Sequence, residues 1–190
     1  MNKKQRTVHA EKDLVRYGRD IIISDIFVSG FDQTHHYYTT VADHTLNVAL
    51  TSLEMAYRLE KLHIHLDKRP LVTGALCHDL GIIGRHNKYK NDAICCQLHP
   101  LDSVKAARTL LKDLDPKTRK IISRHMFPMT PLPPTSLTGW VVDIADTIST
   151  YHELSGHSKG PDADIHLAAR KRIRTLIEQI RGVREPSPVS

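Results

Sequence analysis

The sequence is poor in cysteine and in aromatic residues, and it contains no long apolar run. Its three cysteines, Cys77, Cys95 and Cys96, lack Cys-x-x-Cys spacing, so we expect free thiols rather than a disulfide framework. No apolar stretch reaches the roughly 18 residues of a membrane-spanning helix. Residues 1–6 are too polar to form the apolar part of a secretory signal. These absences predict a cytoplasmic protein without a membrane partner.

The charge is basic overall, but the excess lies at the two ends of the chain. The net charge is +6, from 27 Lys and Arg residues against 21 Asp and Glu residues. The surplus bases fall within residues 1–6 and 159–184, whereas acids and bases balance in residues 7–158. This distribution is more typical of solvated ends than of a nucleic-acid-binding groove. Nucleic acid is therefore not an expected partner.

Apolar residues recur every three or four positions, and no segment alternates like a β-strand over a useful length. The pattern predicts one all-α domain over residues 1–190, with six or seven helices and a core at about 30–155. The expected helices lie at 10–22, 41–61, 70–79, 100–113, 116–126, 137–153 and 163–181. The last of them is amphipathic, so we expect it to pack on the body of the domain or on a second subunit, which would form a homodimer.

The most informative feature is the pair His78-Asp79, which follows an apolar run and precedes Gly81. Gly81 and Gly84 are expected to stop the helix that carries the pair. A histidine and a carboxylate both lose solvation in a packed core unless a charge or a hydrogen bond compensates them. A divalent cation compensates both, so the pair suggests a metal site.

Further side chains of the ligand type lie on separate predicted segments, each beside apolar residues. They are His44, His99, His125 and Asp146. His99 directly precedes Pro100, which places it at the mouth of the next predicted helix. Asp143 lies three residues before Asp146 and competes with it as the distal carboxylate; otherwise it is a partner of a histidine. Helical bundles build metal sites from such inward side chains on facing helices.

This order of residues resembles the HD superfamily of metal-dependent phosphohydrolases, whose signature is a histidine, a later His-Asp pair and a distal aspartate. The matching segments are Asp43-His-Thr-Leu-Asn-Val-Ala49, His78-Asp79 and Ile144-Ala-Asp-Thr-Ile-Ser149. The positions of His99 and His125 match the two extra histidines of binuclear members. Residues 36–153 are also similar to a group of uncharacterised bacterial HD proteins. In those proteins a histidine precedes the first ligand by eight residues, as His36 does here.

The resemblance implies an HD-domain helical bundle and a set of metal ligands. Four residues would hold one cation, and Asp79 would bridge to a second cation held by His99 and His125. His78 and Asp79 are then the expected catalytic pair. The four residues of the first site are His44, His78, Asp79 and Asp146. Cyclic-di-nucleotide phosphodiesterases of the superfamily carry two adjacent late histidines, whereas Met126 follows His125 here, which argues against that substrate.

Mixed imidazole and carboxylate ligands suit Mn, Fe, Co, Ni or Zn, as one or two ions, rather than Ca. Such a cation lowers the pKa of bound water toward about 7 and gives a nucleophile at neutral pH. The polar loop after the His-Asp pair offers Arg85, His86 and Lys88 for binding a phosphate. His36 is expected to line the pocket or to contact a ligand.

The predicted function is hydrolysis of a phosphoester bond in a small phosphorylated substrate, for example a nucleotide, by metal-activated water. Two alternatives stay open at this point. Some HD proteins use the same six ligands to hold two iron ions that activate oxygen, and others are ligand-binding modules without catalysis. Intact ligands and a neutral central region favour an enzyme over a non-catalytic module.

Overall fold

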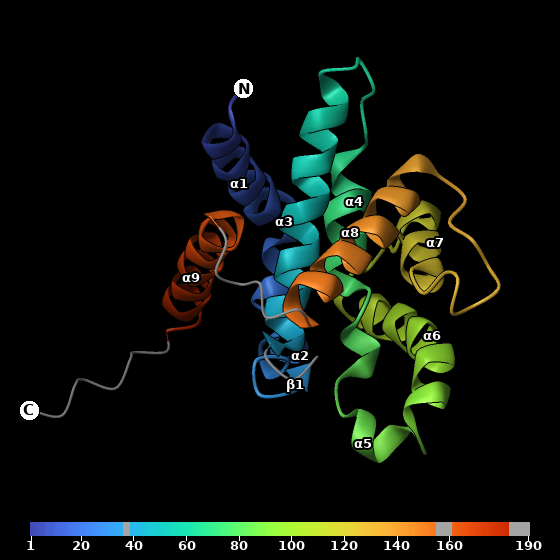
Figure 1. Ribbon diagram of the computed structural model, residues 1–190. Coiled ribbons are helices and arrows are strands. Elements are labelled where there is room, and N and C mark those ends of the chain that lie inside the picture. Colours follow the sequence, from blue (N-terminus) through green and yellow to red (C-terminus); the bar gives the residue numbers. More distant parts are fainter. Residues whose placement is uncertain (36–38, 155–160, 183–190) are drawn as a thin grey trace, which may run out of the picture.

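The computed structural model describes residues 1–35, 39–154 and 161–182, with the backbone alone for residues 161–166. The described residues form helices and one antiparallel pair of two-residue strands, which confirms the predicted all-α class (Figure 1). The elements in chain order are α1 (Lys3–Ile22), α2 (Asp25–Ser29), β1 (Thr34–His35), β2 (Thr39–Thr40), α3 (Val41–Glu60), α4 (Lys68–Cys77), the 3-10 helix η1 (Leu80–Ile82), α5 (Arg85–Lys88), α6 (Asp92–Leu110), α7 (Pro116–Arg124), α8 (Leu137–Leu154) and α9 (Pro161–Arg181).

Local capping signals explain where several helices begin. The Thr40 side chain accepts a hydrogen bond from the Asp43 backbone N–H and starts α3, which places His44 near the first turn. Asp115 accepts hydrogen bonds at the start of α7, and Pro116 occupies the first turn, as the sequence predicts. Asn91 caps α6 in the same way. Contacts between residues close in the sequence therefore hold the backbone at the start of α3, α6 and α7.

The long helix α3 lies at the centre of the bundle, with α1 and α9 on one side and α6 and α7 on the other (Figure 1). Its buried residues include Leu46, Leu50 and Leu53, and the same core cluster contains Leu76 of α4. Burial of such apolar side chains is the main stabilising contribution to the fold. The packed core thus positions the helices that carry the candidate ligands.

Helix α9 packs on the body of the molecule, which was one of the two expected outcomes for the last helix. Ala169, Ile173 and Ile177 are buried in the core cluster that also includes α1 and α3. On the outer side, the Arg172 guanidinium forms two charge-assisted hydrogen bonds with the Glu11 carboxylate of α1. In the described part of the chain, none of the helices is long and apolar enough to cross a membrane.

The prediction that His99 lies at the mouth of a helix beginning at residue 100 is wrong. Helix α6 begins at Asp92 and continues through Pro100, so His99 lies in its interior. A proline inside a helix removes one backbone hydrogen bond and usually ends the helix. Here the Asn91 cap and the buried residues Ser103 and Ala107 hold the segments on either side of Pro100 in one helix. The predicted start of the first helix is also wrong, because α1 begins at Lys3 rather than at residue 10.

Gly81 has a different role from the predicted helix stop, because α4 already ends at Cys77. It allows η1 to approach the backbone of α6. A Cβ atom on Gly81 would lie 2.4 Å from the His99 carbonyl oxygen and 2.4 Å from the Ser103 backbone nitrogen. The Gly81 N–H donates to Ser103 Oγ at 2.9 Å. This close approach brings Asp79 next to His99.

Candidate metal centre

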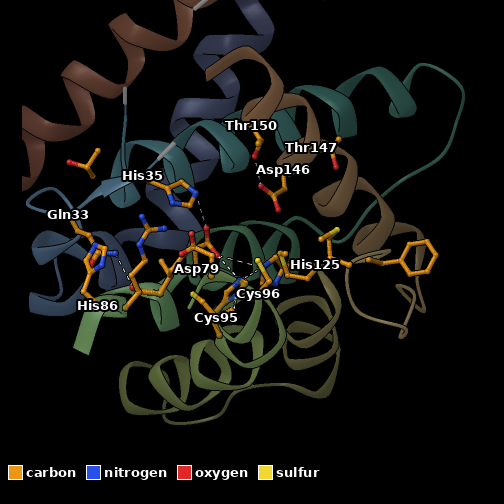
Figure 2. A pocket seen from close by; sticks show the side chains of 18 of the residues that line it. Gln33, His35, Asp79, His86, Cys95, Cys96, His125, Asp146, Thr147 and Thr150 are labelled. Atoms are coloured by element: carbon orange, nitrogen blue, oxygen red, sulfur yellow. Dashed lines mark hydrogen bonds and ion pairs between the residues drawn. The ribbon is translucent and has the colours of Figure 1, made fainter. Parts of the chain in front are cut away.

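All six side chains that the sequence predicts as ligands meet at one buried place. His44 comes from α3, His78 and Asp79 from the end of α4, and the others from α6, α7 and α8. The histidines are at most 3 % exposed, and Asp79 is 4 % exposed. Figure 2 shows Asp79, His125 and Asp146 around the same cavity. Segments that are more than 100 residues apart in sequence thus converge, as between His44 and Asp146.

Asp79 divides the cluster into two groups, because its two carboxylate oxygens face different histidines. Its Oδ2 atom lies 3.4 Å from His78 Nε2 and 3.8 Å from His44 Nε2. Its Oδ1 atom lies 3.1 Å from His99 Nε2 and 3.6 Å from His125 Nε2. A single carboxylate in this position has the geometry to bridge two neighbouring cations.

Asp146 rather than Asp143 completes the first group. Asp146 Oδ1 lies 3.0 Å from His44 Nε2 and 3.9 Å from His78 Nε2. These three side chains bring their donor atoms within 4.8 Å of one another. Asp143 is buried, and its Oδ1 atom has no hydrogen-bond partner among the described residues. Burial and the nearby charge of Asp146 raise the pKa of Asp143 to about 6.

The far nitrogen of each ligand histidine is anchored to an acceptor. The backbone carbonyls of Ala75, Cys95 and Ile122 accept from the Nδ1 atoms of His78, His99 and His125 respectively, at 2.7 to 2.8 Å. The Glu153 carboxylate accepts from His44 Nδ1 at 2.9 Å.

A carbonyl oxygen can only accept, so Nδ1 carries the proton in these rings and Nε2 is the atom available to a cation. Partners of this kind fix the tautomer and the ring orientation of metal-ligating histidines. The four Nε2 atoms therefore face the centre for a defined physical reason.

The charges of the site shift its proton affinities strongly. Burial alone lowers the pKa of His44, but hydrogen bonds to Asp146 and Glu153 outweigh burial and raise it well above 6.5. Burial alone raises the pKa of Asp79, but His78, His125 and His99 outweigh burial and hold it well below 3.8. The pKa values of His78 and His99 are raised as well, whereas burial lowers the pKa of His125. Metal binding at such a site displaces protons, so the affinity for metal rises with pH.

The donor set fits a divalent transition-metal ion. Bonds of about 2.1 Å from one cation to two ligands place the donor atoms about 3.0 Å apart at octahedral angles and about 3.4 Å apart at tetrahedral angles. The distances within the first group span 3.0 to 3.9 Å. The buried Nε2 atom of His78 forms no hydrogen bond in the described part of the chain. A buried nitrogen of this kind is costly unless a partner such as a cation satisfies it.

Two residues at the site were missed by the sequence analysis. Glu153 holds the His44 ring, and it also accepts from Asn47 Nδ2 at 2.9 Å. His35 is 5 % exposed, and its Nε2 atom lies 3.6 Å from Asp79 Oδ2. The sequence signal for His35 was the doublet His35-His36, of which only the second member was selected. His36 lies outside the described residues.

A cavity of about 1000 Å³ opens beside the cluster and is lined by Asp79, His99, His125 and Asp146. Arg85 and His86 line this cavity, as expected of phosphate-binding residues. Lys88 does not line it and instead donates from Nζ to the Gly81 carbonyl at 3.3 Å, which corrects its predicted place. The remaining wall is partly apolar and includes Cys95, Cys96, Met126, Phe127 and Met129.

Comparison with protein families matches the HD domain to residues 41–151. The matched region spans more than half of the chain and contains all six ligand-type residues. Comparisons with curated proteins and with solved structures gave no significant match.

Proposed function

This chain belongs to the HD domain family, and we propose that it is a metal-dependent phosphohydrolase that cleaves a phosphoester bond of a small phosphorylated substrate such as a nucleotide. HD domains are typical of metal-dependent phosphohydrolases. One observation carries the proposal: four histidines with anchored Nδ1 atoms direct Nε2 toward two carboxylates at the floor of a cavity.

Two sets of residues would hold the cations. His44, His78 and Asp146, with Oδ2 of Asp79, form the first set. His99 and His125, with Oδ1 of Asp79, form the second set. A bound divalent transition-metal ion, whether Mn, Fe, Co, Ni or Zn, supplies activated water at neutral pH and positive charge beside a phosphoryl oxygen.

The cavity walls supply the remaining contacts of the proposed reaction. Arg85 and His86 lie in the short helix α5 and line the cavity, and a guanidinium suits bidentate binding of a phosphate. Phe127 and Met129 give an apolar wall for the part of the substrate that does not react. A volume of about 1000 Å³ is large enough for a compound of nucleotide size. The basic residues would orient the phosphate toward the cations that Asp79 would help to hold.

The test combines metal analysis with a substrate panel. The protein is purified without added metal, its metal content is measured, and phosphate release from nucleotides and other phosphoesters is followed with and without oxygen. We expect release that is independent of oxygen, is abolished by a chelator and is restored by one of the metals. Asp79→Ala should lose both metal uptake and phosphate release while retaining its helical circular dichroism.

Other outcomes would contradict the proposal. Bound iron with oxygen consumption and no phosphate release would identify an oxygenase. Tight binding of a phosphorylated compound without turnover, at any metal loading, would identify a ligand-binding module.

A further inference from the structure

We propose that His35 is an additional nitrogen ligand of the cation site that includes His44 and Asp79. This inference rests on the proposed metal centre and extends it to a residue outside the HD signature. It assigns a metal-binding role to strand β1, which precedes the matched HD region.

The position of His35 relative to Asp79 is comparable to that of the other histidines of the first group. Its Nε2 atom lies 3.6 Å from Asp79 Oδ2, between the corresponding distances of His78, 3.4 Å, and His44, 3.8 Å. The donor atoms of His35, His44 and Asp79 all lie within 4.8 Å of one another. Figure 2 shows the His35 ring directed at Asp79 from the side opposite His125.

The distance itself favours a shared cation over a direct hydrogen bond. Nitrogen and oxygen atoms joined by a hydrogen bond lie about 2.7 to 3.2 Å apart. Two ligands of one cation with bonds of about 2.1 Å lie roughly 3.0 to 4.2 Å apart, depending on the angle between them. The 3.6 Å between His35 Nε2 and Asp79 Oδ2 falls in the second range and outside the first.

Two sets of contacts hold the hairpin against the site. Before His35, the Gln33 side chain donates to the Ile82 carbonyl at 2.9 Å and accepts from the Gly84 N–H at 2.6 Å. These bonds join the hairpin to the loop that follows Asp79. The contacts of the Gln33 side chain with this loop consequently place His35 on the Asp79 side.

On the other side of the hairpin, Thr39 pairs with His35 in the β1–β2 ladder. The Thr39 hydroxyl lies 3.0 Å from the His35 carbonyl oxygen and 3.0 Å from Glu153 Oε2. Glu153 in turn accepts from His44 Nδ1. The hairpin and the His44 ring therefore share one anchoring carboxylate, which couples the placement of His35 to that of an HD ligand.

The number of ligands has a chemical consequence. With His35, the proposal gives the first site five protein donors: His35, His44, His78, Asp79 and Asp146. Tetrahedral zinc uses four ligands, and catalytic zinc sites usually take three from the protein. Five protein donors suit a cation of higher coordination number, such as Mn, Fe, Co or Ni in an octahedral site.

The test uses cobalt binding to the full chain of the wild type and of His35→Gln. Cobalt(II) is titrated by calorimetry and by its visible absorption, whose shape and intensity report the ligands and their number. We expect His35→Gln to bind the first cobalt at least about tenfold more weakly, since even residues that only orient metal ligands contribute 10- to 100-fold to affinity. The cobalt spectrum should change as well. His65→Gln, an exposed histidine in the loop before α4, is the matched control.

A second variant keeps the proposal testable if His35→Gln does not fold, as judged by circular dichroism. In His35→Cys a thiolate replaces the imidazole, and its bond to cobalt would add a charge-transfer band that the wild type lacks. Unchanged affinity and spectrum in His35→Gln, or no new band in folded His35→Cys, would overturn the inference. Either result leaves the phosphohydrolase proposal standing, because that proposal is tested by phosphate release. A wild type that binds no metal overturns both.

Discussion

The Glu153 carboxylate accepts a hydrogen bond from Nδ1 of His44, while Nε2 of the same ring faces Asp146. Glu153 lies 109 residues after His44 in the sequence. The contact joins the last turn of α8 to the first turns of α3. A carboxylate in this position fixes the ring and increases the basicity of its other nitrogen. The candidate metal centre therefore includes a carboxylate that holds a ligand-type histidine in place.

We expect Glu153→Gln to bind divalent metal about 10- to 100-fold more weakly than the wild type. The amide can still accept a hydrogen bond from His44, but it lacks the negative charge. Metal affinity measured by calorimetry tests this prediction. Glu178→Gln, a partly exposed position on α9, serves as a control that should keep wild-type affinity. Equal affinities of both variants would show that Glu153 only stabilises the fold.

His125→Ala should reduce the metal stoichiometry from two ions per chain to one. The second set of ligands contains three side chains, and His125 Nε2 lies 3.0 Å from His99 Nε2 within that set. Removing one of three ligands leaves too few donors to hold the second cation. Elemental analysis after dialysis against dilute metal measures the change. A variant that still holds two ions would rule out His125 as a ligand, and a wild type with one ion would leave only the first set.

Asp143→Asn should stabilise the metal-free protein above pH 6 and have little effect below pH 4. The pKa of Asp143 is raised from 3.8 to about 6 by burial and by the charge of Asp146. Between these two pH values the unfolded chain releases this proton and the folded chain retains it, so wild-type stability falls as pH rises. Above the folded pKa the destabilisation by the buried carboxylate is constant. The uncharged amide of Asp143→Asn avoids this destabilisation.

Unfolding temperatures from pH 4 to pH 8, in the presence of a chelator, measure this difference. Asp113→Asn, at an exposed position, should follow the wild type throughout. The same protein samples separate the two candidate distal ligands: Asp143→Asn should keep metal binding, and Asp146→Asn should lose it. The reverse result would move the distal ligand to Asp143.

Gly81→Ala should destabilise the protein by about 1 to 3 kcal/mol or more, because an added methyl group overpacks a filled space. The new Cβ would lie 2.4 Å from backbone atoms of His99 and Ser103, and backbone cannot rotate away as a side chain can. Urea denaturation measures the free energy of unfolding. Metal affinity should fall as well, since the same contact holds Asp79 beside His99. A variant as stable as the wild type would show that η1 can shift without cost.

The sequence predicted the helical class because apolar spacing is local information, and the resemblance to the HD superfamily implied that the six side chains converge. Apolar spacing reports helices directly. A His-Asp pair beside apolar residues is costly without a compensating charge, so it marks a site before any contact is known. The start of α7 at Asp115-Pro116 was also predictable, since a capping side chain acts within three residues.

Other features could not be predicted because they depend on which segments come to lie together. Pro100 normally ends a helix, and only the burial of residues on both sides of it keeps α6 continuous. The fixed tautomer of His44 depends on Glu153, which no local pattern marks. His35 was likewise not selected, because no local pattern in the sequence distinguishes it from His36.

The chain alone thus determined which chemical groups are present and where most of the helices lie, since hydrophobic periodicity and capping act over a few residues. The tertiary structure decided which atoms face one another: the two oxygens of Asp79 toward separate sets of histidines, and Glu153 behind His44. Those relationships arise from packing between helices that are distant in sequence. A shift of about one ångström in that packing would take a side chain out of reach of a cation.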